Sequence, residues 1–221
     1  MRWKKRNEHL EKQPTMKQKL YLVLSGILLF ILISSKEAVA EPMIAPGAAD
    51  SMTSEKLADM GESIIFGKLV GRNPADMGVG KGQCSLCHSF KEGDKGFTAL
   101  NLNLSGITER ATERIKEARY LKPDTVQLES FPGSGRATTP LEYIVESLIC
   151  PDCYVVAGFG RKGTNDRESL MPMIQRPPIS LTIDEQIAVI TWLYVNDGKM
   201  PDPPKKIRAA FEKFIPEADR R

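Results

Sequence analysis

The short segment Cys84-Ser85-Leu86-Cys87-His88 holds the residues with the clearest chemistry in this chain. Its pattern, C-x-x-C-H, is the attachment signature of a c-type haem. Two thiols three positions apart can bond the two vinyl groups on one edge of the porphyrin, and the adjacent histidine can offer its imidazole to the iron. The chain has only two histidines, so a chance histidine here is improbable. The segment predicts one covalently bound haem, attached through Cys84 and Cys87 and ligated by His88.

The second axial ligand of the iron has to come from elsewhere in the chain. Haem iron that is held by a histidine can take a methionine thioether as its other ligand. The other histidine, His9, lies in the N-terminal region that we expect to be removed, whereas nine methionines are available. Met171 is favoured because it precedes Pro172 in a constrained loop that can hold a soft sulfur rigidly over the haem. The alternatives are Met173, then Met77 and Met200.

A second cysteine pair, Cys150-Pro151-Asp152-Cys153, repeats the C-x-x-C spacing without the histidine, since Tyr154 follows it. A second haem of the usual kind would therefore lack its ligand. In an exported protein, a disulfide that closes the turn after a helix is the preferred interpretation. A redox-active dithiol stays open as an alternative, as does a haem with some other ligand. A zinc site built from all four cysteines is also open, although it would leave His88 unexplained.

The N-terminus has the three-part organisation of an export signal. Residues 1–19 are polar and basic, residues 20–34 form an almost unbroken apolar run, and Ala38-Val39-Ala40 is typical of a cleavage site. As a helix the apolar run would span roughly 22 Å at about 1.5 Å per residue, whereas a bilayer core is about 30 Å thick. We therefore predict a signal peptide over residues 1–40 and a periplasmic location, with an uncleaved membrane anchor as the alternative.

Length and charge limit what the rest of the chain can do. The 221 residues are 41% hydrophobic, which suits one domain with extensions and a core that does not depend on disulfides. Residues 1–40 hold eight of the 31 Lys and Arg and three of the 28 Asp and Glu, which leaves residues 41–221 with 23 and 25 and a net charge of −2. Nothing in this balance indicates the basic face of a nucleic-acid-binding protein.

Helical patterns surround the cysteine motif on both sides. Apolar stripes predict helices, and threonine-based capping-box patterns at Thr139 and Thr182 mark two of their starts. No alternation typical of strands is evident, so we predict an all-α fold. The expected helical segments are residues 54–70, 108–122, 139–150, 182–195 and 205–215.

Together these features resemble those of class I c-type cytochromes, over residues 54–195. In that family an N-terminal helix crosses a C-terminal helix beside the haem, through glycine, aromatic and aliphatic contacts. Gly61 and Phe66 match the first helix of this crossing. Trp192 and Leu193 match the second. The resemblance implies the class I cytochrome c-like helical fold around one haem.

Two further segments are similar to the same family. Asn103-Leu104-Ser105-Gly106-Ile107-Thr108-Glu109-Arg110 is similar to its Asn-Leu-x-Gly-x-x-x-Arg stretch. The arginine of that stretch commonly lies near a haem propionate, so the resemblance implies this role for Arg110. Met171-Pro172 falls where the axial Met-Pro of the family falls. The implied axial ligands are therefore His88 and Met171.

The chain departs from the family pattern in two places. The stretch from Phe66 to Cys84 is longer than in short cytochromes, which indicates an insertion. The proline whose carbonyl orients the proximal histidine is replaced by Leu102. Leu102 still has a carbonyl, so the hydrogen bond to His88 can survive without the rigidity of a proline.

The expected function is single-electron transfer between respiratory redox proteins, by a monohaem cytochrome that is not itself an enzyme. One alternative is a haem-bearing subunit of a larger membrane respiratory or dehydrogenase complex, with the insertion before Cys84, the Pro-rich linker and the C-terminal amphipathic segment as docking elements. A peroxidase and a zinc-binding protein with four cysteine ligands are further alternatives. The expected organisation is a signal peptide at 1–40, a flexible linker at 41–53, a cytochrome c domain at 54–199, and a Pro-rich linker with an amphipathic segment at 200–221.

Overall fold

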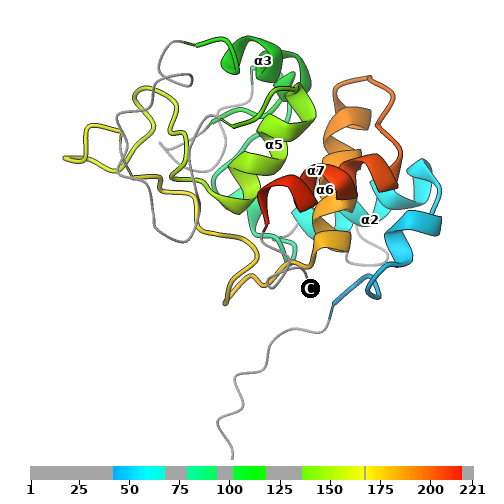
Figure 1. Cartoon of the computed structure of the whole chain (residues 1–221). Coiled ribbons are helices and arrows are strands. Elements are labelled where there is room, and N and C mark those ends of the chain that lie inside the picture. The colour runs from blue at the N-terminus through cyan, green and yellow to red at the C-terminus, as the bar shows by residue number, and fades with distance from the viewer. Residues whose placement is uncertain (1–41, 68–78, 94–101, 118–135, 167, 216–221) are drawn as a thin grey trace, which may run out of the picture. The chain divides into compact units, whose positions relative to one another are not determined.

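Two helices cross at a glycine, and this crossing forms the centre of the fold. In this computed structural model helix α2 spans Ser54–Phe66 and helix α6 spans Ile183–Asn196. A Cβ added to Gly61 would lie 2.2 Å from the backbone oxygen of Ala188 and 2.8 Å from the Cβ of Trp192. The helices thus approach more closely than a side chain at position 61 would allow (Figure 1).

The structure describes residues 42–67, 79–93, 102–117, 136–166 and 168–215. They belong to the second of two units into which the chain divides, Val39–Arg221. Besides α2 and α6, the elements in chain order are the 3-10 helix η1 (Ala48–Ser51), the 3-10 helix η3 (Cys84–Leu86) and the helices α3 (Ile107–Arg114), α5 (Pro140–Ile149) and α7 (Pro204–Phe214).

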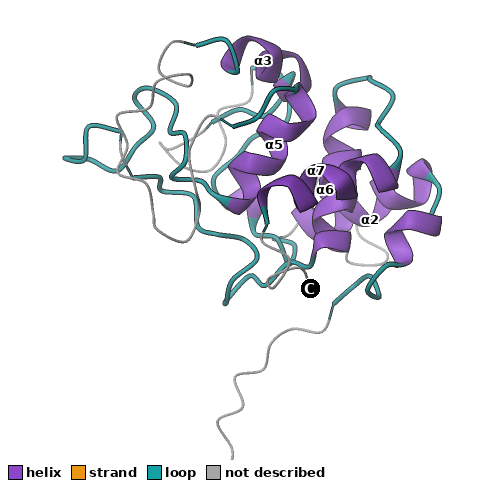
Figure 2. Ribbon diagram, viewed as in Figure 1, coloured by secondary structure: helices purple, strands orange, loops and turns teal. Residues whose placement is uncertain are grey.

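Helices and loops make up all the described ranges (Figure 2), with a single isolated bridge between Gly160 and Ser169. The predicted all-α class is thereby confirmed for this part of the chain. The predicted signal peptide, its apolar run over 20–34 and residues 118–122 of the predicted basic helix lie outside the described residues. No helix among the described residues has both the length and the apolar character needed to span a bilayer.

Threonine caps begin the two helices for which capping boxes were predicted. The hydroxyls of Thr139 and Thr182 each accept a hydrogen bond from the backbone N–H three residues later. The box at Thr182 is complete, because the Glu185 carboxylate accepts from the Thr182 N–H in return. The box at Thr139 is only half formed, because the Glu142 carboxylate accepts from the N–H and hydroxyl of Thr138 instead.

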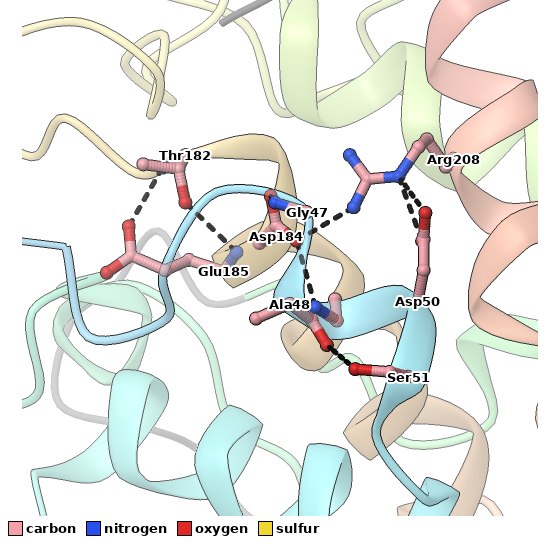
Figure 3. A network of polar contacts seen from close by, with 9 residues as sticks. Gly47, Ala48, Asp50, Ser51, Thr182, Asp184, Glu185 and Arg208 are labelled. Atoms are coloured by element: carbon pink, nitrogen blue, oxygen red, sulfur yellow. Dashed lines mark hydrogen bonds and ion pairs between the residues drawn. The ribbon is translucent and has the colours of Figure 1, made fainter.

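The segment before α2 differs from the flexible linker predicted for 41–53. The Met43 N–H donates to the Glu185 carboxylate at 2.7 Å, and the Ala49 N–H donates to the Asp184 carboxylate at 3.0 Å. Figure 3 shows this segment lying against the first turn of α6. The two carboxylates lie 142 and 135 residues further along the chain than the N–H groups they bind. No local pattern in residues 41–53 could therefore indicate these hydrogen bonds.

Helix α7 packs against α5 and α6 and completes the core. Its Arg208 donates from Nε to Asp50 at 2.9 Å and from a terminal nitrogen to Asp184 at 2.7 Å, which joins α7 to η1 and to α6 (Figure 3). The predicted amphipathic segment is therefore a helix of the core. Its buried apolar side chains are Ile207, Ala210, Phe211 and Phe214.

Two lysine–carboxylate ion pairs have the same nitrogen-to-oxygen distance but differ sharply in burial. Lys81 Nζ lies 2.8 Å from Glu185, with side-chain exposures of 11% and 0%. Lys206 Nζ also lies 2.8 Å from Asp202, but the exposures are 65% and 26%. The first pair is therefore much less screened by water than the second.

We expect Lys81→Met to lower the free energy of unfolding by about 3 kcal/mol, because it leaves the buried charge of Glu185 with the neutral N–H donors of Met43 and Thr182 but without the countercharge of Lys81. Lys206→Met is the matched control and should cost less than about 1 kcal/mol, since exposed pairs are weak. Urea unfolding followed by circular dichroism measures both changes. Equally small losses for the two variants would contradict the prediction.

Candidate functional site

Cys84, Cys87 and His88 come together in one tight turn. Gln83 has a left-handed backbone conformation with φ of 55°, and the 3-10 helix η3 follows it directly. The N–H groups of Cys87 and His88 both donate to the Cys84 carbonyl, at 3.1 and 2.9 Å. The three residues predicted to attach and ligate a haem thus share a single turn of backbone.

Glycines let this turn lie directly on the end of α2. The Gly82 N–H donates to the Ile64 carbonyl at 2.8 Å. A Cβ on Gly80 would lie 2.2 Å from the same carbonyl oxygen, and one on Gly82 would lie 3.0 Å from Cys84 Sγ. Larger residues at either position would push the cysteine turn away from the helix crossing.

The two thiols of the turn are free, but they differ in environment. Cys84 is half-buried, and its Sγ lies 3.5 Å from the Gly82 carbonyl, to which the thiol donates. Burial raises the pKa of the Cys84 thiol to about 12. Cys87 is exposed. Both sulfurs are in the reduced state that thioether formation requires.

The imidazole of His88 is oriented by a backbone carbonyl. Its Nδ1 lies 2.9 Å from the Leu102 oxygen, which confirms the hydrogen bond that the sequence suggested for Leu102. Burial lowers the pKa of His88, which favours the neutral ring. With the Nδ1 proton donated to the carbonyl, the lone pair is on Nε2, and metal-ligating histidines usually have this arrangement.

Long-range hydrogen bonds hold the loop that carries this carbonyl. The Leu104 N–H donates to the Ser89 carbonyl at 2.7 Å. The Gly106 N–H donates to the carboxylate of Asp197 at 2.7 Å, across 91 residues of sequence. These bonds anchor the loop that follows Leu102 to Ser89 and to Asp197.

Asp197, which directly follows α6, has a role that the sequence analysis missed. The second carboxylate oxygen of Asp197 accepts from the N–H and the hydroxyl of Thr108, at 3.0 and 2.8 Å. Asp197 therefore caps the start of α3, whose own N-cap residue, Gly106, has no side chain to do so. No local pattern could have indicated this pairing, because the two ends meet only in the folded chain.

Arg110 lies on α3 and turns back toward the same loop. Its guanidinium donates to the carbonyls of Asn103 and Ser105. These contacts place Arg110 next to the loop that orients His88. Its proposed approach to a haem propionate stays a prediction.

Aromatic rings connect the cysteine segment to the helix crossing. Phe90, Phe66 and Trp192 form a mutual edge-to-face cluster, with ring centroids 5.2 to 5.3 Å apart. The rings come from the end of the cysteine segment, from α2 and from α6. The contact that the sequence suggested between Phe66 and Trp192 is therefore present. Phe90 packs against both of these rings and so links the cysteine segment to the core.

Cys150 and Cys153 are joined in a disulfide with their Cα atoms 5.3 Å apart. This agrees with the preferred interpretation of the second pair. Sulfurs that are bonded to each other do not act as thiolate ligands, so the pair in this state offers nothing to a shared zinc ion.

Met171 lies in the long loop between α5 and α6. Its side chain is half-buried and packs against the same hydrophobic core that Cys84 borders. Of the alternatives, Met173 is also half-buried, Met200 is 92% exposed, and Met77 lies outside the described residues. Burial at the edge of the core favours Met171 or Met173 over Met200 as the thioether ligand.

The donor groups suit a covalently bound haem. Two free thiols and a neutral imidazole come from one turn, and a half-buried thioether comes from the long loop at the border of the same core. No protein-family model matches this sequence, and no curated protein matches it significantly. The assignment of function therefore depends on the residues described above.

Proposed function

We propose that this chain is an exported monohaem c-type cytochrome of class I that carries single electrons between respiratory partners in the periplasm. The observation that carries the proposal is the turn from Cys84 to His88. It combines two free thiols with an imidazole whose Nδ1 is bonded to the Leu102 carbonyl at 2.9 Å. Covalent haem attachment uses these groups at this spacing.

The crossing of α2 and α6 supports the class I assignment. Gly61 permits the close approach of the two backbones, and the cluster of Phe66, Phe90 and Trp192 lies next to the cysteine segment. An N-terminal and a C-terminal helix that cross beside the haem motif are what the resemblance to this family implies.

When bound, haem supplies an iron that gains or loses one electron. Cys84 and Cys87 would hold the porphyrin edge, while Nε2 of His88 and the sulfur of Met171 would ligate the iron. Two protein ligands that stay in place keep the rearrangement between oxidation states small. A thioether ligand raises the reduction potential, because it favours the reduced iron.

Helix α7 favours the carrier over the subunit of a larger complex. The subunit hypothesis used the C-terminal segment, with the insertion and the Pro-rich linker, as docking elements. The apolar side of α7 is instead buried against the core of this chain, through Ile207, Phe211 and Phe214. That surface is not available to a partner.

The test of the proposal is a pyridine haemochrome measurement on the full chain, expressed in a host that attaches haem covalently. We expect a ratio of haem to protein near one, because only the first cysteine pair is followed by a histidine. A colourless product would reject the proposal. A ratio near two would mean that the second pair also binds haem.

A further inference from the structure

The disulfide-closed turn contacts the loop that carries Met171 through Asp152. Cys150 and Cys153 close this turn by their disulfide, and the Cys153 N–H donates to the Cys150 carbonyl at 2.9 Å. Asp152, between them, accepts the N–H of Ser169 at 2.5 Å. The Ser169 hydroxyl in turn accepts the N–H of Met171 at 3.0 Å. Two hydrogen bonds, one to the backbone and one to the side chain of Ser169, therefore link the turn to the backbone of Met171.

The other side of Met171 is attached to the same turn. Gln175 Nε2 donates to the carbonyl of Ile149, the residue before the first cysteine, at 2.8 Å. Both attachments thus end within the four residues from Ile149 to Asp152. The short stretch between Ser169 and Gln175 is held at its two ends by one rigid support.

We propose that Asp152, in the turn closed by the Cys150–Cys153 disulfide, is a positioning residue that holds the sulfur of Met171 on the haem iron. The inference depends on the proposed function, since the position of the sulfur matters only if Met171 ligates the iron. A carboxylate that accepts a backbone N–H makes a charge-assisted bond, which is stronger than a neutral one. Loss of this bond would increase the fraction of molecules in which Met171 has left the iron.

Imidazole competition measures that fraction, because added imidazole binds only where the methionine has left. Asp152→Ala is expected to tighten the apparent affinity of the oxidised protein for imidazole about tenfold, equivalent to about 1.4 kcal/mol. Asp152→Asn keeps an acceptor oxygen but loses the charge, so it should tighten the affinity by a smaller factor than Asp152→Ala. Ser169→Ala removes only the bond to the Met171 N–H, and it should shift the affinity in the same direction by a smaller factor.

Asp166 provides the matched control in the same loop. Its carboxylate accepts the N–H groups of Gly158 and Gly160, both at 2.9 Å, and Gly160 forms the isolated bridge with Ser169, so the link from Asp166 to Met171 is less direct than that from Asp152. Asp166→Ala should therefore tighten the imidazole affinity by a much smaller factor than Asp152→Ala. A tightening equal to that of Asp152→Ala would show general loosening of the loop and would overturn the proposal.

Two outcomes distinguish failure of this inference from failure of the proposed function. Unchanged imidazole affinity in both Asp152→Ala and Ser169→Ala, with normal far-ultraviolet circular dichroism, would reject the positioning role alone. Absence of haem from the wild-type chain would instead reject the proposed function. If Asp152→Ala does not fold, Ser169→Ala gives the deciding measurement, because it removes a single half-buried hydroxyl and leaves the Asp152 bond in place.

Discussion

Replacement of Cys84 and Cys87 together by serine is expected to give a chain without covalently bound haem. Serine hydroxyls do not form thioethers with vinyl groups, so the porphyrin would have no bond to the chain. The measurement is the pyridine haemochrome ratio, together with haem staining after denaturing electrophoresis. The expected change is from about one haem per chain to none, because C-x-x-C-H is the attachment signature.

The chain contains its own matched control for this experiment. Cys150 and Cys153 have the same spacing but are joined in a disulfide and are followed by Tyr154. Their double replacement by serine should leave one haem per chain and should tighten imidazole binding, as Asp152→Ala does. If the Cys150 and Cys153 variant loses haem while the Cys84 and Cys87 variant keeps it, haem is attached at the second pair and the proposed site is rejected.

The second large effect is expected for Met171→Ala. The oxidised protein should lose its weak near-infrared sulfur-to-iron band completely, because alanine offers no ligand. The reduced protein should then bind carbon monoxide, which a closed methionine-ligated iron resists. Its reduction potential should also fall, since a thioether stabilises the reduced iron. Haem content should not change, because the thioether bonds are elsewhere.

Met173→Ala is the control for the ligand assignment. Met173 is two residues away in the same loop and is also half-buried, so the two variants remove the same type of side chain from positions of similar exposure. Met173→Ala should keep the near-infrared band and should not bind carbon monoxide. The opposite pattern would move the axial ligand to Met173, and persistence of the band in both variants would exclude each of them.

The sequence alone was sufficient where chemistry or structure is local. Two thiols that bond one porphyrin edge and an imidazole that ligates the iron must lie within a single turn, so spacing alone marks the residues from Cys84 to His88 as a candidate haem-attachment segment. The starts of α5 and α6 could be found because a capping threonine bonds an N–H only three residues away. The close crossing at Gly61 followed from resemblance to a family.

The tertiary structure alone decided which distant groups support the site. Asp152 reaches Ser169 across 17 residues, and Asp197 reaches Gly106 across 91. Glu185 binds Met43 across 142 residues, which makes the segment before α2 part of the fold rather than a linker. A carboxylate that accepts a backbone N–H leaves no periodic pattern in the sequence, because any N–H can be its donor. Only the packing of the helices determines which one lies within hydrogen-bonding distance.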